Sequence, residues 1–451
     1  MEYFISKMLN GKERTESEHE RLIYRNSLEL VEAHDLTFDP EYPVPVDMRL
    51  ADRVFSAALN LLEEVGVYST DTKRVVEFSK SEMRQCIRNS PFSFRIGSNA
   101  DSTEVRFRNV LDERTPLIIG GPCAVPITDD LFLPVHRSYA KINRVDSVAP
   151  ASYHCSEYPR YRLKKSPLNM YEAHKAVKLI KEACRVEGRP DICCVSPPFI
   201  DDVRTALSIS DPQFMGRGDL EELYPKPDLK ADLDQMARVI HYRGVGVYYV
   251  SSSMLLMGGI TSATPEQFAI EMTAEILKSR ILYSCPLSFV HPNHLRSPAS
   301  RSLEVLWASF ITSMAITRNS DLLHGIVVNN SSGPCTESMM YETAVQTIGS
   351  TVCGADSLSG PVSNAGNELN HAAGLDALFM AAVSELSVSL SLKDANDLCL
   401  ILFNEYRDKK PEFGKKFDEC YDLSRIEPSE EYLDIYERAM EHIYELISES
   451  L

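Results

Sequence analysis

The stretch YEAHKAVKLIKEACRVEGRPDICCVSPP, residues 171–198, places a helix pattern directly before a strand pattern. Apolar residues in 171–186 recur every three or four positions, as on one face of a helix. Residues 192–195 are apolar throughout, and two prolines follow Ser196, so this run indicates a buried strand that ends in a loop. A helix followed by a fully buried strand is the unit of a parallel sheet covered on both faces.

The same unit recurs toward the C-terminus. Helix patterns alternate with apolar strand patterns at 232–253, 264–290, 302–330 and 336–360, and a long helical stretch follows at 367–392. Repetition of this length favours a closed (β/α)8 barrel over an open sheet. No GxGxxG motif follows a strand, so we expect neither a nicotinamide nor a flavin site.

The rest of the chain is divided around this barrel, and the fold class expected is α/β. Residues 1–45 are predicted to form an N-terminal arm, and residues 46–145 a mixed α/β cap or extension. The barrel core is expected at 146–400, and a C-terminal helical extension at 401–451, where the last residues form an amphipathic helix pattern.

The amino-acid composition limits the kinds of molecule that this chain is expected to bind. The formal net charge of -18 argues against nucleic acid and against anionic membranes, and leaves cationic small molecules or a basic protein surface. No apolar stretch approaches the length that spans a bilayer. The 11 cysteines include no CxxC pair, which favours reduced thiols and a cytoplasmic location.

The C-terminal ends of barrel strands carry the pocket, and here the side chains at these ends are polar but mostly uncharged. They lack the paired carboxylates of a glycosidase and the lysine of a Schiff-base aldolase. Cys285, His291 and His294 could ligate zinc, but Pro292 and Pro298 indicate an irregular loop, so we expect no metal. Tyr249 and Phe289 are the aromatic residues placed to face a quaternary cation.

Five stretches in order resemble one known family, the monomethylamine:corrinoid protein methyltransferases of methanogens. The stretches are LLEEVGVYSTDTKRVV (61–76), GGPCAVPITDDLFLPVHRSYA (120–140), IKEACRVEGRP (180–190), SGPCTE (332–337) and KKFDECYDLSRIEPSEEYLDIYE (415–437). The similarity runs from about residue 38 to the C-terminus. It implies a (β/α)8 barrel, often in a homohexamer, that moves a methyl group from an amine to the Co(I) of a separate corrinoid protein docked at the barrel mouth. The corrinoid cofactor would therefore belong to the partner and not to this chain.

The resemblance also assigns positions. Where the family carries pyrrolysine, this chain has Ser196; the family's glutamate and glutamine fall on Ser252 and Val327, and its remaining acid falls on Asp228. Serine cannot form the adduct between the pyrrolysine imine and the amine. We therefore expect a different methylated amine, quaternary or betaine-like, which departs as a neutral amine and needs no such adduct.

The residues expected to form the site follow from both lines of argument. Asp228 and Ser196 are predicted to be catalytic, and the residues predicted to bind substrate are Ser252, Tyr249, Phe289, His291, Asn330 and Val327. Two alternatives remain open at this point: a barrel that has lost catalysis and acts as a binding or regulatory protein, and a zinc-assisted methyltransferase.

Overall fold

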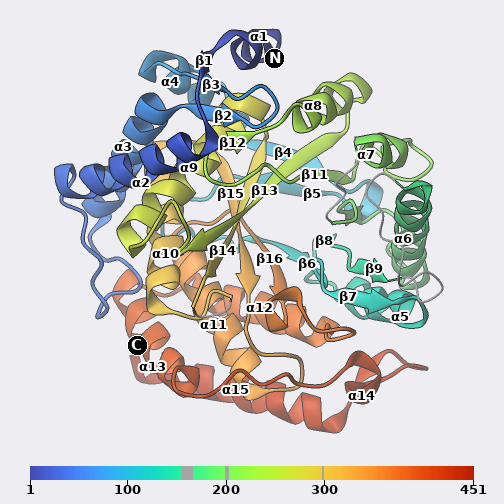
Figure 1. The fold of residues 1–451 in the computed structure, drawn as a ribbon. Helices are drawn as coiled ribbons and strands as arrows, with labels where there is room; N and C mark the ends of the chain where they lie inside the picture. Colours follow the sequence, from blue (N-terminus) through green and yellow to red (C-terminus); the bar gives the residue numbers. More distant parts are fainter. Residues whose placement is uncertain (155–165, 199–202, 297–298, 451) are drawn as a thin grey trace.

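The barrel predicted from the repeating units is present. The computed structural model describes residues 1–154, 166–198, 203–296 and 299–450, and within these ranges eight parallel strands form one sheet (Figure 1). In their order around the sheet, the strands are β10 (Cys193–Cys194), β8 (Ser147–Val148), β6 (Leu117–Gly120), β16 (Ser357–Val362), β15 (Leu323–Asn329), β14 (Leu287–His294), β13 (Tyr248–Met257) and β11 (Leu220–Leu223).

The sheet closes between its first and last strands. A parallel bridge joins Val195 to Leu220, and the backbone N–H of Ser196 donates to the carbonyl of Leu220 at 2.9 Å. The seam of the barrel therefore lies directly after β10, at the point where the strand runs out into Pro197 and Pro198.

A ring of helices surrounds the strands, one after each strand along the chain. Within the described ranges these are α5 (Asp129–Ala140), α6 (Pro167–Val186), α7 (Val203–Ile209), α8 (Leu233–Val245), α9 (Pro265–Tyr283), α10 (Leu303–Asn319), α11 (Glu337–Val352) and α12 (Gly374–Ser387). Local sequence fixes several of their ends. Thr264 and Thr336 cap α9 and α11 by accepting backbone N–H bonds, and Gly246 ends α8 in the left-handed conformation.

Three of these helices are buried on almost every side because the two extensions of the chain cover them. α2 (Glu16–Ala33) and α3 (Met48–Val65) pack on α9, α3 also packs on α10, and α13 (Leu392–Tyr406) and α15 (Glu430–Ser450) pack on α11 (Figure 1). A helix without a solvent face carries no polar stripe. Its charged residues must then be paired, as Lys278 is with Glu275 at 2.5 Å.

Smaller elements complete the molecule. They are α1 (Glu2–Asn10), α4 (Lys80–Arg88), α14 (Phe417–Cys420), β1 (Lys12–Glu13), β2 (Val67–Ser69), β3 (Arg74–Val76), β4 (Ser93–Ile96), β5 (Thr103–Arg106), β7 (Pro126–Thr128), β9 (Ser152–His154), β12 (Lys230–Ala231), β17 (Tyr421–Asp422) and β18 (Glu427–Pro428). In the described ranges, no helix combines the length and the apolar character that crossing a membrane requires.

One boundary expected from the sequence needs correction. The barrel was expected to begin at residue 146, but β6 pairs with both β16 and β8 and is therefore a barrel strand. The helix that follows this strand in the ring, α5, contains Pro134, which obscures the helical pattern that would mark β6 as part of a repeating unit.

Candidate functional site

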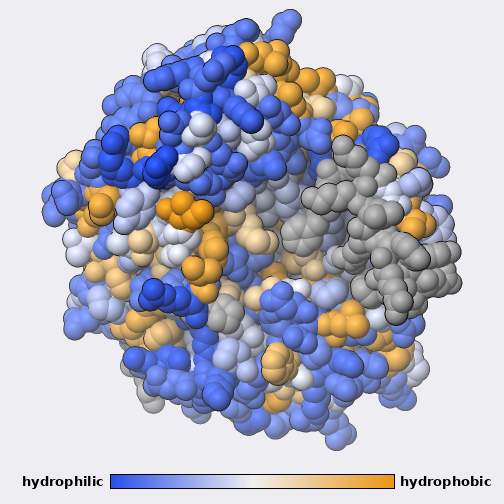
Figure 2. All heavy atoms as spheres, viewed as in Figure 1, coloured by the Kyte–Doolittle hydropathy of each residue, from blue (hydrophilic) through white to orange (hydrophobic). Residues whose placement is uncertain are grey.

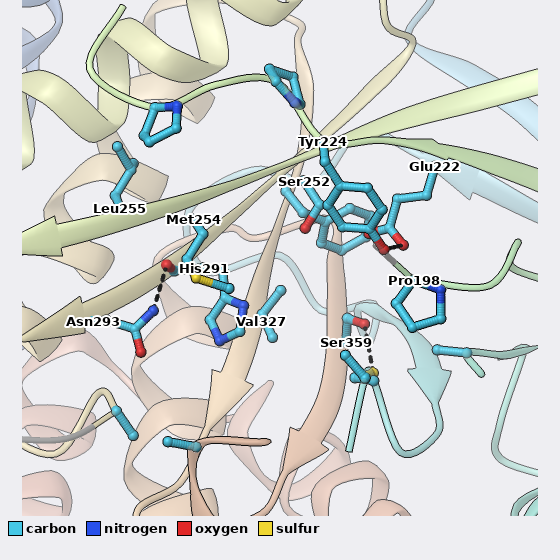
Figure 3. Close-up of a pocket in the computed structure, with 18 of the residues that line it drawn as sticks. Pro198, Glu222, Tyr224, Ser252, Met254, Leu255, His291, Asn293, Val327 and Ser359 are labelled. Atoms are coloured by element: carbon cyan, nitrogen blue, oxygen red, sulfur yellow. Dashed lines mark hydrogen bonds between the residues drawn. The ribbon is translucent and has the colours of Figure 1, made fainter. Parts of the chain in front are cut away.

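A cavity of about 650 Å³ lies at the C-terminal ends of the barrel strands (Figure 3). Most of its wall is apolar, with Ile119, Val195, Pro198, Val250, Phe289 and Val327 among the lining residues. The polar groups that reach it include Glu222, Tyr224, Ser252, His291, Asn293 and Ser359. An apolar cavity with a few convergent polar groups is the usual form of a small-molecule site, and this end of the barrel is where such sites lie.

Glu222 is the acidic group of the cavity. It lies on β11 opposite Val250 of β13, and both side chains point inward. Burial raises the pKa of the Glu222 carboxyl to about 7, although hydrogen bonds from Tyr224 and Ser252 oppose the rise. The Tyr224 hydroxyl donates to Oε2 of Glu222, so the phenol holds the carboxyl in place (Figure 3).

The neighbouring Glu221 lies on the opposite face of the same strand. Successive side chains of a strand point to opposite faces, so Glu221 points away from the cavity toward Arg238 and Tyr242 of α8. Burial raises the pKa of Glu221 to about 8. Only Glu222 of this pair can act on a ligand in the cavity.

Four of the residues predicted to bind substrate line the cavity together. Ser252 and Phe289 lie side by side in the register of β13 and β14, His291 follows two positions later on β14, and Val327 comes from β15. Their spacing of two residues along each strand places them on the inner face. The structure thus brings these side chains to one place, and their role in binding stays a prediction.

Ser196 lies where its strand was expected to end, but its side chain is used in the barrel wall. The residue is 2% exposed, and Val195 and Pro198 on either side line the cavity while Ser196 does not. Its Oγ accepts a hydrogen bond from the backbone N–H of Glu222 at 2.9 Å. The expectation that this side chain projects into the cavity is therefore corrected, because the serine hydroxyl is short and completes the ladder at the seam.

Asp228 is not the acid of the cavity. Its Oδ1 accepts a hydrogen bond from Thr261 at 3.1 Å, and its Oδ2 lies 3.6 Å from Nζ of Lys230. Lys226 and Pro227 line the rim of the cavity, but the chain then turns through a left-handed conformation at Asp228 and carries this carboxylate away. The structure therefore does not bring Asp228 to the cavity, and the acid that lines the cavity is Glu222, six residues earlier.

Tyr249 and Asn330, which were also predicted to bind substrate, are not among the residues that line the cavity. Tyr249 occupies the outward position of β13, and its hydroxyl donates to the carbonyl of Tyr283 in α9 at 2.9 Å. Asn330 is fully buried against α11, where its Nδ2 donates to Thr343 and its Oδ1 accepts from Gln346, both at 2.7 Å. Each side chain packs between a strand and a helix.

Of the three residues considered as zinc ligands, Cys285 is separated from His291 and His294 by most of a strand. Cys285 precedes β14, whereas His291 and His294 lie near its end. Six residues of strand span roughly 20 Å, which is far beyond the reach of one metal ion. Among the described residues, no group of three or more His, Cys, Asp or Glu side chains is placed to hold a metal.

The sequence reasoning missed the strand that carries the central acid. β11 has only four residues, and two adjacent glutamates interrupt its apolar pattern. The proline-rich segment YPKPD after it reads as a loop. The number of strands could have revealed β11. A closed eight-stranded barrel needs a further strand between the one ending at Ser196 and the one beginning at Tyr248.

Together, the fold and the cavity define a (β/α)8-barrel protein with an enzyme-type site at the mouth of the barrel. Comparison with known proteins gives the particular family. The profile of the monomethylamine methyltransferase MtmB family matches residues 2–447, so this chain belongs to that family.

Individual relatives agree with this assignment. The monomethylamine methyltransferase MtmB1 of Methanosarcina acetivorans is 29% identical over 422 residues, which is 93% of this chain and 92% of that protein. The MtmB protein of Methanosarcina mazei shows the same identity and the same coverage. The crystal structure of the Methanosarcina barkeri monomethylamine methyltransferase superposes with a TM-score of 0.94 at 28% identity, covering 99% of this chain and 97% of that one. A structure of a hydroxylamine complex of MtmB matches equally well.

Proposed function

We propose that this chain transfers a methyl group from a methylated ammonium cation in the barrel cavity to a corrinoid carried by a separate protein. The observation that carries the proposal is Glu222, a carboxyl group held in an apolar cavity at the barrel mouth. In the described part of the chain, no Lys or Arg side chain forms an ion pair with it. A cationic ligand would supply the missing charge and favour the ionised carboxylate.

The chemistry required of the chain is simple. A methyl group leaves nitrogen when that nitrogen is positively charged, because the N–CH3 electron pair then stays on a neutral amine. Glu222 would hold the cation, and Tyr224 would keep the carboxylate directed at it. Phe289 and the other apolar walls exclude water and offer the ring face that attracts cations. Positioning and electrostatics, rather than a covalent intermediate on the protein, would be the contribution of this chain.

The acceptor has a suitable docking surface at the mouth. Three apolar side chains rim the cavity and remain exposed to solvent, Met254 at 46%, Leu256 at 43% and Leu295 at 61%. Figure 2 shows apolar side chains gathered over this part of the surface, near the ends of β13 and β14. These residues would contact the face of the corrinoid ring, whose cobalt supplies the nucleophile when the partner protein is docked.

Two observations support a permanently charged, larger amine rather than methylammonium. Ser196 is buried in the seam and offers no electrophile to the cavity. The cavity of about 650 Å³ also lies in the range typical of sites for much larger ligands than a one-carbon amine. We therefore propose a quaternary ammonium compound as the methyl donor, although the relatives are named for monomethylamine.

The proposal is tested by turnover. The purified chain is incubated with Co(I) cobalamin as acceptor and with a panel of mono-, di-, tri- and tetramethylated ammonium compounds and betaines, and methylcobalamin is followed by its absorbance. We expect product with quaternary donors and a loss of at least about 100-fold with Glu222→Gln. Product from monomethylamine alone would contradict the choice of donor. If no donor reacts with either cobalamin or a corrinoid protein, the non-catalytic barrel becomes the better account.

A further inference from the structure

A corner of the cavity away from Glu222 is built from three side chains whose hydrogen bonds can be assigned in sequence. The starting point is the backbone carbonyl of His291, which can only accept, and it accepts from Nδ2 of Asn293 at 3.2 Å (Figure 3). The other end of that amide, Oδ1 of Asn293, must then be an acceptor, and it accepts from Nδ2 of Asn329 at 2.8 Å. Both amide orientations follow from the one carbonyl group.

This chain of bonds fixes the tautomer of His291. Because Nδ2 of Asn329 donates to Asn293, only Oδ1 of the Asn329 side chain remains to accept a hydrogen bond. That oxygen is buried without another partner. The His291 and Asn329 side chains interact, and Nε2 is the ring nitrogen that lies buried without a partner of strict hydrogen-bond geometry, so we pair it with this oxygen. An amide oxygen requires a donor, so the proton of the ring is on Nε2.

The other ring nitrogen is therefore an acceptor. Burial lowers the pKa of His291 to about 4, so the imidazole is neutral at physiological pH. A neutral ring with its proton on Nε2 carries a lone pair on Nδ1. His291 lines the cavity, and in the described part of the chain no donor hydrogen-bonds to this nitrogen. The ring is shown beside Val327, below Met254 and apart from Glu222 and Tyr224 in Figure 3.

We infer that the substrate carries a hydrogen-bond donor, such as a hydroxyl group, away from its methylated nitrogen, and that Nδ1 of His291 accepts this bond. The inference rests on the proposed function and narrows its substrate class to hydroxylated quaternary ammonium compounds. A site with an unused acceptor selects a ligand with a donor, because an analogue without the donor leaves the acceptor unpaired on binding.

The same arrangement disfavours a betaine. A betaine carboxylate has only acceptors, and the cavity would present it with the Glu222 carboxylate and the Nδ1 lone pair. Lys226 is the cationic side chain at the rim, but it is 47% exposed and lies 4.0 Å from the carboxylate of Asp232. The sequence led us to expect either a quaternary amine or a betaine as the methyl donor. The hydrogen-bond acceptors in this corner of the cavity fit a quaternary amine without a carboxylate.

The test compares two cations of nearly equal size. Calorimetry measures the binding of (2-hydroxyethyl)trimethylammonium and of propyltrimethylammonium, in which a methyl group replaces the hydroxyl, to the full chain without any corrinoid. We expect the hydroxyl compound to bind about tenfold more tightly. His291→Phe should remove this preference while keeping the affinity for the propyl compound within about twofold, and His294→Gln should keep the preference.

The outcomes separate this inference from the proposed function. Equal binding of the two cations, or a preference that survives His291→Phe, overturns the inference and leaves the proposed function standing. Failure of both cations to bind overturns the proposed function and the inference with it. Nitrogen-15 spectra of the ring, assigned by the His291→Phe variant, give a second readout: an unprotonated Nδ1 between pH 6 and 8 is expected, and a protonated Nδ1 refutes the tautomer.

Discussion

The hydroxyl of Ser196 accepts a hydrogen bond from the backbone N–H of Glu222 at 2.9 Å across the seam of the barrel. At the next position along the seam, the backbone of Ser196 donates to Leu220, so the side chain continues a ladder that the backbone begins. Ser196 thereby fixes the strand that carries the acid of the cavity. One small polar side chain links barrel closure to the position of Glu222.

This link predicts the effect of removing the hydroxyl. Ser196→Ala should leave the N–H of Glu222 buried without a partner and lower the free energy of unfolding by about 1–3 kcal/mol. Affinity for tetramethylammonium should fall as well, because β11 loses a constraint. Ser196→Thr is the matched control, since it keeps the hydroxyl and suits a strand. Urea denaturation and calorimetry check both effects, and a Ser196→Ala variant as stable as the wild type would refute the proposed role of the seam.

Cation binding should depend on pH through Glu222. Its pKa of about 7 means that the carboxyl is protonated at lower pH and charged at higher pH. A quaternary cation has no proton of its own to lose, so its affinity should rise about tenfold per pH unit up to about pH 7 and level off above it. Calorimetry with tetramethylammonium from pH 5.5 to 8.5 gives the profile. With Glu222→Gln we expect weak binding and no such dependence, and a steep profile in that variant would point to another group.

Tyr224 should set the midpoint of that profile. Its hydroxyl donates to the Glu222 carboxylate and stabilises the charged form. Tyr224→Phe should therefore raise the pKa of Glu222 and move the midpoint upward by about one pH unit, while affinity well above the new midpoint stays close to that of the wild type. The same calorimetric series checks this shift. A midpoint that stays in place would show that the phenol does not stabilise the carboxylate in solution.

A glycine behind the cavity should control the position of Phe289. A Cβ at Gly325 of β15 would lie 2.2 Å from the Phe289 ring, which lines the cavity. Gly325→Ala should push the ring inward, lower the free energy of unfolding by about 1–3 kcal/mol and weaken cation binding. Gly244→Ala is the control, because a Cβ there meets open space in α8 and should stabilise by up to about 1 kcal/mol. Equal effects of the two substitutions in denaturation experiments would contradict the packing argument.

The barrel was predictable from sequence because β13, β14 and β15 are long strands that contain apolar runs, and because the helices next to them carry clear caps, as at Thr264 and Thr336. Ser252 came from the family resemblance and Phe289 from its place near the end of a strand, and the register of β13 and β14 puts both on the inner face. Glu222 was missed because its strand is too short to show a pattern, and Asp228 was chosen in its place. Contacts such as that between Ser196 and Glu222 join residues far apart in sequence, and no local pattern reveals them.

The most direct test of the proposed methyl donor is a competition. Monomethylamine and (2-hydroxyethyl)trimethylammonium, one of them labelled with carbon-13 in its methyl groups, are offered together at equal concentration to the chain, its corrinoid protein partner and reductant. The methyl group found on cobalt is then identified by mass spectrometry, with the label exchanged in a second run. We predict that nearly all of it comes from the quaternary compound and that Glu222→Gln abolishes the transfer. Methyl groups derived mainly from monomethylamine would contradict the account.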